Sequence, residues 1–340
     1  MVLERIFSSA WLEKHFLSSF TIGVIYSALS LVLAQAIFPQ NTGIVSLVFL
    51  SLLLTPSLRA LLREEEANEE KEKRLSIKHL YNDNKQAVKT YTGIFLGVFS
   101  AYFATTAFLP FLGLHPLTLV QEQLFIDPAL AGRAAFDTAL FTSILANNWL
   151  VLVVTFLLAV LIAEGSIFFV VWNASAWGAV FGYRALTASL QLQEPLLVIA
   201  ATLVGLIALH VLLEGGAYIL AAISGSVIST SVMQHSKEIN RFSTYAAVAA
   251  TLYVLFSKLA TNLQPSAHLL LLIPLFIAAV YLLRYSFEEQ AHQEVFAYNF
   301  WLFIVAVAAL ILGTIVETIL LSTSTNLHTI YSASTLFSIN

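Results

Sequence analysis

The chain has 340 residues, of which 59% are hydrophobic and only 11% are charged, with a mean hydropathy of +0.84. Soluble domains carry about 25% charged residues, so this composition excludes a water-soluble globular protein. The formal net charge of −4 gives no indication of nucleic acid binding. The chain has no cysteine, which excludes disulfides, thiolate metal sites and cysteine nucleophiles.

The apolar residues occur in runs of about 20, which is the length of a helix that crosses a hydrocarbon core of about 30 Å. Backbone groups in that core must be paired internally, so such runs are helical. They also lack the alternation of an outer-membrane barrel. The sequence therefore predicts an all-α, polytopic transmembrane helical bundle of about nine or ten membrane segments, some of them re-entrant or broken.

The N-terminal region, residues 1–62, is expected to hold an interfacial helix and two crossings, at about 16–38 and 43–62. A charged helical segment follows at 63–90. Residues 59–89 contain eight of the sixteen lysines and arginines, which by the positive-inside rule indicates the cytoplasm. Two crossings separate this segment from the N-terminus, so the N-terminus is predicted to be cytoplasmic too. The chain is expected to be a multi-pass protein of the cell membrane.

The predicted membrane core covers residues 91–232. It begins with a crossing at about 91–109 and continues with residues 111–147, an extracytoplasmic segment in which carboxylates outnumber the single arginine. The last region, residues 233–340, is predicted to add three crossings, at about 245–263, 268–283 and 296–321.

Two apolar stretches of this core are too long for one crossing. Residues 148–186 contain Glu164-Gly165, which predicts two helices joined by a tight turn. Residues 196–232 are expected to divide near 210–216. If both are full hairpins, the basic loop after residue 232 lies outside, against the positive-inside rule. If either stretch is a kinked single crossing or a re-entrant pair, the loops that follow it would lie on the opposite side of the membrane.

An ionisable group at membrane depth costs about 2.5–3.5 kcal/mol on insertion scales, so each is a candidate functional residue. Four qualify: Glu164, His210, Glu214 and Glu317. His210 and Glu214 are four residues apart and share a helix face. Their pair could act as a proton relay, a cation site or a conformational switch, or it could be a polar clasp between helices.

The other two carboxylates lead to different expectations. Glu164 stands beside the predicted turn, where its side chain can reach the membrane interface. Glu317 lies near the end of the last crossing and needs a partner, for which Lys258, Arg284 and His210 are the candidates.

Asn147, Asn148 and Asn173 form a second polar set. Asparagine is a good helix N-cap, so Asn148 is expected to open a helix. Asn173 lies within a crossing among small residues. There, Gly178 and Gly182 form a GxxxG pattern that suits close helix packing.

Glu289 and His292 form a Glu-x-x-His outside the predicted crossings, a spacing that di-metal carboxylate proteins draw from two helices. A single Glu-x-x-His motif in a charged loop is more often part of a solvated surface, so Glu289 and His292 are weak candidates for metal ligands. No cofactor is predicted. The chain lacks Walker A, HExxH, GxSxG and Rossmann motifs, so a non-enzymatic protein is expected.

Two stretches carry a resemblance to a known family. The first stretch is Ile-Leu-Ala-Asn147-Asn148-Trp-Leu-Val, which is followed by Glu164-Gly165 and by Trp172-Asn173-Ala-Ser-Ala-Trp-Gly178. The second stretch is Leu-His210-x-x-x-Glu214-x-x-Ala217, which is followed by Ala-Ala-Ile-Ser-Gly225. They resemble the stage II sporulation protein M family, although Leu209 replaces a family proline. The first 90 residues, with Glu64-Glu65-Glu66 and His79, look like the archaeal-type branch of that family. The resemblance implies a helical membrane protein that helps to assemble envelope enzymes and is not itself a hydrolase.

Two functions are therefore predicted. The first is a non-enzymatic scaffold for a membrane-remodelling or envelope-associated complex, a homo-oligomer with membrane lipid and other envelope or membrane proteins as partners and no nucleic acid. The alternative is a channel or transporter for protons, ions or a small solute that uses His210 and Glu214. A water-reachable cavity around that pair would favour transport, and dry packing would favour the scaffold.

Overall fold

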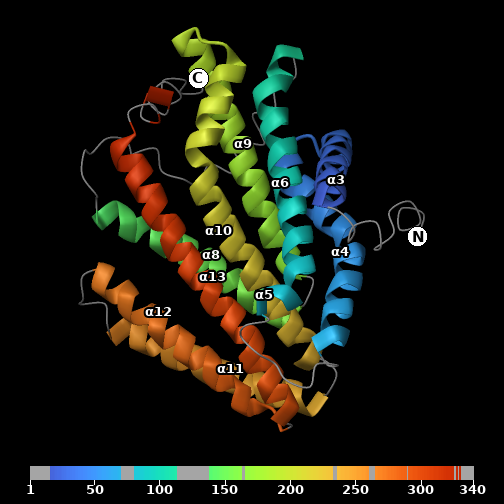
Figure 1. Ribbon diagram of the computed structural model, residues 1–340, viewed down its shortest axis with the longest axis vertical. Helices are drawn as coiled ribbons and strands as arrows, with labels where there is room; N and C mark the ends of the chain where they lie inside the picture. The colour runs from blue at the N-terminus through green and yellow to red at the C-terminus, as the bar shows by residue number, and fades with distance from the viewer. Residues whose placement is uncertain are drawn as a thin grey trace.

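The computed structural model describes residues 16–69, 80–112, 138–162, 165–232, 236–259, 265–288, 290–324, 327 and 329–330. All regular structure in these ranges is helical (Figure 1). The long helices are α3 (Phe16–Ile37), α4 (Thr42–Glu69), α6 (Lys85–Phe108), α8 (Thr138–Leu161), α9 (Ser166–Leu192), α10 (Leu196–Val232), α11 (Ser236–Leu259), α12 (Pro265–Leu282) and α13 (Gln290–Thr323). Short elements are α5 (Leu80–Asp83) and the 3-10 helices η1 (Leu109–Leu112) and η5 (Leu283–Ser286).

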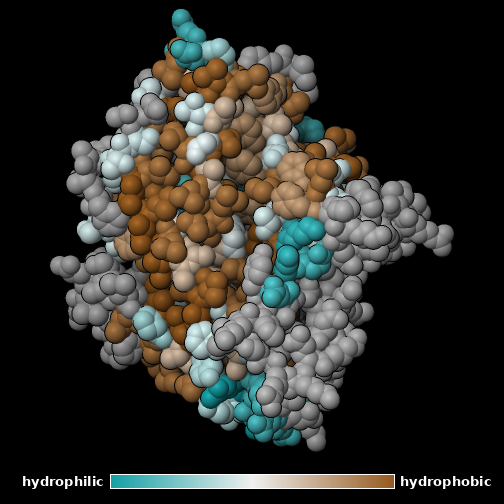
Figure 2. All heavy atoms as spheres, in the orientation of Figure 1, coloured by the Kyte–Doolittle hydropathy of each residue, from teal (hydrophilic) through white to brown (hydrophobic). Residues whose placement is uncertain are grey.

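Six of the described helices are long and apolar enough to cross a membrane, namely α3, α6, α8, α9, α10 and α13. Shorter apolar segments cover 42–56 in α4 and 271–286 in α12 and η5. Figure 2 shows hydrophobic residues over most of the visible face of the bundle, as a lipid-facing surface requires. The chain is a multi-pass helical membrane protein, and the predicted nine or ten membrane segments are not confirmed.

The first overlong stretch divides as predicted, because α8 ends at Leu161 and α9 begins at Ser166. The start of α8 differs from the prediction. The helix begins at Thr138, so Asn148 lies well inside it, and the expectation that this residue caps the helix was wrong. The remainder of the predicted extracytoplasmic segment, 113–137, falls outside the described residues.

The second overlong stretch does not divide, and the prediction of a break near 210–216 was wrong. Residues 196–232 form the single 37-residue helix α10, about 55 Å long. Gly215 has a packing role instead. A Cβ on this residue would lie 2.8 Å from the ring of Phe95, so the missing side chain lets α6 approach α10.

Contacts between helices fix their directions. Gly178 and Gly182 of α9 lie against Phe99 and Phe103 of α6. The contacts follow the same order along both helices, so α6 and α9 are parallel. The turn after α9, where Gln193 is left-handed with a φ of 57°, reverses the chain into α10. The N-terminal end of α6 and the C-terminal end of α10 therefore lie at the same end of the bundle (Figure 1).

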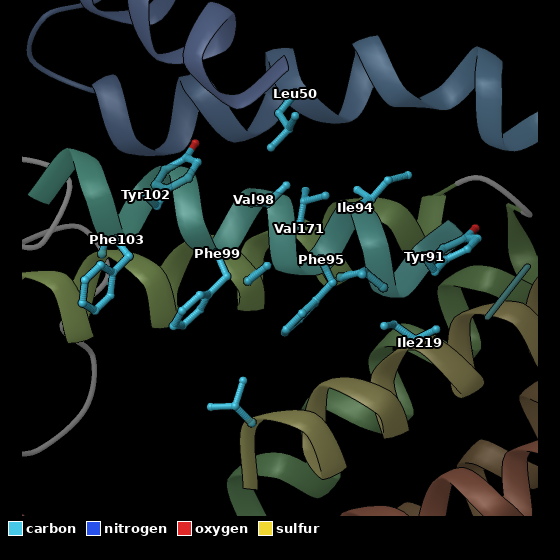
Figure 3. Close-up of a cluster of buried hydrophobic side chains, with 14 of the residues drawn as sticks. Leu50, Tyr91, Ile94, Phe95, Val98, Phe99, Tyr102, Phe103, Val171 and Ile219 are labelled. Atoms are coloured by element: carbon cyan, nitrogen blue, oxygen red, sulfur yellow. The ribbon is translucent and has the colours of Figure 1, made fainter. Parts of the chain in front are cut away.

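The tightest of these contacts confirms that the GxxxG pattern is a packing motif. A Cβ on Gly178 would collide with the carbonyl oxygen of Phe99, and a Cβ on Gly182 with that of Phe103. Figure 3 shows the apolar core beside this crossing, where Phe95, Val98 and Phe99 of α6 lie among side chains of the neighbouring helices.

Gly182→Ala is expected to lower thermal stability in detergent, because overpacking a tight contact costs about 1–3 kcal/mol. Gly216→Ala is the matched control. Nothing lies within 4 Å of a Cβ built on Gly216, and alanine favours a helix interior over glycine by about 0.5–1 kcal/mol. The control should be as stable as the parent protein or more stable. Equal melting temperatures for both variants would contradict the tight α6–α9 crossing.

The remaining helices depart from the predicted crossings. The helix α11 covers the region predicted as 245–263 but is not among the six helices that qualify as spans. The charged segment is helical in its described parts, since α4 continues to Glu69 and α5 and α6 begin at Leu80 and Lys85. Residues 70–79 lie outside the described residues.

Candidate functional site

The most unusual feature of the bundle interior is a contact between two carboxyl groups. Glu214 of α10 has a side chain that is only 2% exposed, and it forms a hydrogen bond with Glu317 of α13, which is partly buried. Gly313 makes this contact possible, because a Cβ on it would lie 2.5 Å from Cγ of Glu214. The backbone of α13 thus lies directly against Glu214, with Glu317 one turn further along.

The chemistry of this contact requires a proton. A carboxylate only accepts hydrogen bonds, so one of two carboxyl groups that bond to each other must be protonated in order to donate. Two ionised carboxylates in an apolar interior would repel each other and would also carry a large desolvation cost. The arrangement of Glu214 and Glu317 is therefore that of a pair that shares at least one proton.

A third helix contributes Asn148, which is buried and lies within reach of the Glu214 carboxyl. Oδ1 of Asn148 accepts from Nδ2 of the exposed Asn147 at 3.4 Å, which leaves the Asn148 amide hydrogens to donate to the Glu214 carboxyl. These bonds connect α8, α10 and α13 through one polar array. Oε1 of Glu214 has no hydrogen-bond partner among the described residues.

His210 lies one turn before Glu214 and is also buried, but its environment differs from the prediction. Its ring meets Phe181 of α9 edge-on, with ring centroids 6.4 Å apart, and its Nδ1 has no partner among the described residues. The contacts of Glu214 are to Glu317 and Asn148, across helix interfaces. The close approach of α13 at Gly313 explains why the carboxyl pairs with another helix and not along its own.

The same contact identifies the partner of the Glu317 carboxyl. Of the three candidates, Arg284 instead lies over Tyr281 and Tyr285, with its guanidinium carbon 4.2 and 4.5 Å from the two ring centroids. The side chain of Lys258 lies outside the described residues. The partner of Glu317 is Glu214, which the sequence analysis had placed in a different pair.

The other predicted residues do not join this array. Asn173 donates to the carbonyl of Phe169 within α9 at 2.8 Å. His292 lies with its ring edge-on to Phe287, and no group of three or more metal-ligating side chains occurs in the described part of the chain. Glu164 and Glu289 fall outside the described residues.

Two residues of the site were missed. Tyr218, one turn after Glu214, is buried beneath Trp177, with ring centroids 6.1 Å apart, and lies close enough to interact electrostatically with both carboxyls. Gly313 stands four residues before Glu317. The i,i+4 spacings Glu214–Tyr218 and Gly313–Glu317 were the available signals, but neither reveals which helices face each other.

Comparisons with protein-family models, curated proteins and solved structures give no match for this chain. The fold and the site together define a class: a multi-pass helical membrane protein with a proton-sharing carboxyl pair between two of its long helices.

Proposed function

We propose that this chain is a non-enzymatic transporter of the cell membrane that binds and releases a proton at Glu214 and Glu317. The observation that carries the proposal is the hydrogen bond between two carboxyl groups on different helices. Ionisable residues inside membrane segments are typical of proton relays in pumps and transporters. The transported ion in this proposal is the proton itself.

The chemistry couples protonation to helix position. With the shared proton in place, the two carboxyls attract each other and hold α10 against α13 at Gly313. Loss of that proton leaves two like charges in a site of low dielectric constant, where repulsion is strong. Proton release therefore separates the two helices, and proton binding closes them. Asn148 and the exposed Asn147 supply a polar connection from the surface of α8 to the pair.

Helix directions support a cytoplasmic N-terminus. Because α10 is one helix, the basic residues Lys237 and Arg241 after it lie at the same end of the bundle as Lys85 and Lys89 at the start of α6. This removes the conflict that a divided 196–232 stretch created with the positive-inside rule. The basic residues at the start of α6 and those after α10 then share one side, which we assign to the cytoplasm.

A proton flux assay tests the proposal. Liposomes that contain the protein and a pH-sensitive dye are given an inward proton gradient, with the membrane voltage clamped by potassium and valinomycin. The parent protein should acidify the lumen at least tenfold faster than Glu317→Gln, because glutamine keeps the hydrogen bond but cannot release a proton. Asn173→Ala is the control, since the hydrogen bond of that side chain to a described residue lies within α9, and it should retain the parent rate.

The second candidate function is the non-enzymatic scaffold that the resemblance to stage II sporulation protein M implies. The close glycine-mediated crossings and the dry surroundings of Glu214 favour it. In that role the chain would assemble as a homo-oligomer with other envelope or membrane proteins. Equal flux for the parent, Glu214→Gln and Glu317→Gln, with unchanged stability, would overturn the transporter and leave the scaffold.

A further inference from the structure

The helix α11 lies at the edge of the bundle, against α12 and η5 (Figure 1). Among its described side chains only that of Phe242 is buried, in contact with Phe287, with ring centroids 6.1 Å apart. Arg241 anchors the same end through an ion pair with Glu288 at 2.5 Å. The helix is thus fixed at its base, and most of its described surface meets the surroundings.

That surface has two different faces. One is an apolar ridge at spacings of three and four residues, with side chains between 47% and 61% exposed: Tyr245, Val248, Leu252 and Leu255. The adjacent face is exposed and polar: Asn240, Ser243, Thr244 and Thr251. A helix in water would not present such a ridge. On the adjacent face the hydroxyls of Thr244 and Thr251 donate to carbonyls of the helix itself, whereas Asn240 and Ser243 disfavour surroundings of hydrocarbon alone. Amphipathic helices of this kind lie at the membrane surface.

The groups at the base of α11 indicate which lipids it meets. Arg284 lies over Tyr281 and Tyr285, and Tyr245 stands one turn after Arg241. Tyrosine and arginine are typical anchors at the level of lipid headgroups. The base also follows directly from the C-terminal end of α10, at the end of the bundle that holds Lys85 and Lys89 and also Glu238 and Glu288. Arginines at this level are complementary in charge to anionic headgroups.

We propose that α11 lies along the membrane surface at the end of the bundle where α6 begins, and that Arg241 and Arg284 bind anionic lipids. Val248, Leu252 and Leu255 lie among the acyl chains just below the headgroups. Arg241, Tyr245 and Arg284 meet the headgroups, and the face with Ser243 and Thr251 meets water. This surface is separate from the carboxyl pair, so it stands whether or not the chain transports protons.

Adjacent positions provide a matched test in a chain without cysteine. Single cysteines at Leu252 and Thr251 are labelled with the fluorophore NBD in liposomes. The label at 252 should be quenched by lipids with a nitroxide near the headgroup, and the label at 251 by aqueous iodide. Three results would overturn the proposal: iodide quenching at both positions, quenching of both by a nitroxide deep in the acyl chains, or quenching of neither because protein covers them.

Lipid charge is tested with the label at 252 in phosphatidylcholine vesicles that contain increasing phosphatidylglycerol. Arg241→Gln should raise the phosphatidylglycerol content needed for half-maximal headgroup quenching about fivefold, as expected for one basic group near an anionic surface. Glu288→Gln breaks the same ion pair but keeps the arginine, so it should need no more phosphatidylglycerol than the parent. If the two variants shift equally, the ion pair positions the helix and anionic lipid does not bind Arg241.

Discussion

Replacing Glu214 with leucine is expected to destabilise the protein far more than replacing it with glutamine. Glutamine can donate to Glu317 and accept from Asn148, so the array between α8, α10 and α13 stays connected. Leucine leaves the Glu317 carboxyl and the Asn148 amide hydrogens without this partner, at about 1–3 kcal/mol for each unsatisfied group. Melting temperatures in detergent should therefore follow the order parent, Glu214→Gln, Glu214→Leu, with the last clearly separated.

The control for this series is Asn173→Leu, which removes a polar side chain whose hydrogen bond to a described residue lies within α9. Its melting temperature should lie close to that of the parent protein. Equal and severe destabilisation by both substitutions of Glu214 would contradict the proton-sharing pair. That result would mean that the site requires a charged carboxylate, which glutamine cannot supply.

Raising the pH should move α10 and α13 apart, and Glu317→Gln should abolish the movement. The shared proton is lost as the pH rises, so the contact becomes a repulsion between two carboxylates, whereas a glutamine at 317 leaves no second charge. Spin labels on cysteines at Leu209 and Leu312, whose side chains are exposed on the two helices, would report the distance by electron paramagnetic resonance. We expect a shift of several ångströms in the parent protein.

Gly313→Ala provides a second check on the same distance. A methyl group at 313 would press on Cγ of Glu214, so this variant should show the larger separation at every pH. A distance that does not change with pH in the parent protein would exclude a protonation-driven movement, whatever the stability of the variants.

The sequence predicted the class of the protein well because hydrophobic length is a local property. The runs of about 20 apolar residues, the turn near Gly165 and the GxxxG at Gly178 and Gly182 each depend on a few neighbouring positions. The break expected near Gly215 failed for the opposite reason. The role of Gly215 is decided by Phe95 of α6, more than a hundred residues away, and the local sequence gives no information about that ring.

The site was predicted residue by residue but not as a site. Glu214 and Glu317 were each singled out by the cost of burying an ionisable group, which is readable from the sequence. Asn148 was singled out for a different reason, as the expected cap of a helix. Their assembly was not, because four-residue spacing favoured a His210–Glu214 contact along one helix. The choice between that neighbour and Glu317 depends on which face of α13 meets α10. This is set by Gly313, a residue that has no chemistry of its own.

The uninterrupted length of α10 gives the position of Glu214 a mechanical meaning. Eighteen residues of the helix precede it and eighteen follow it, so the carboxyl pair sits at the midpoint of a stiff rod. Each half of α10 is about 27 Å long. A rotation of the helix by about 10° around the position of Glu214 would move its two ends by about 5 Å in opposite directions. One proton gained or lost at the centre could thereby open one side of the membrane as it closes the other.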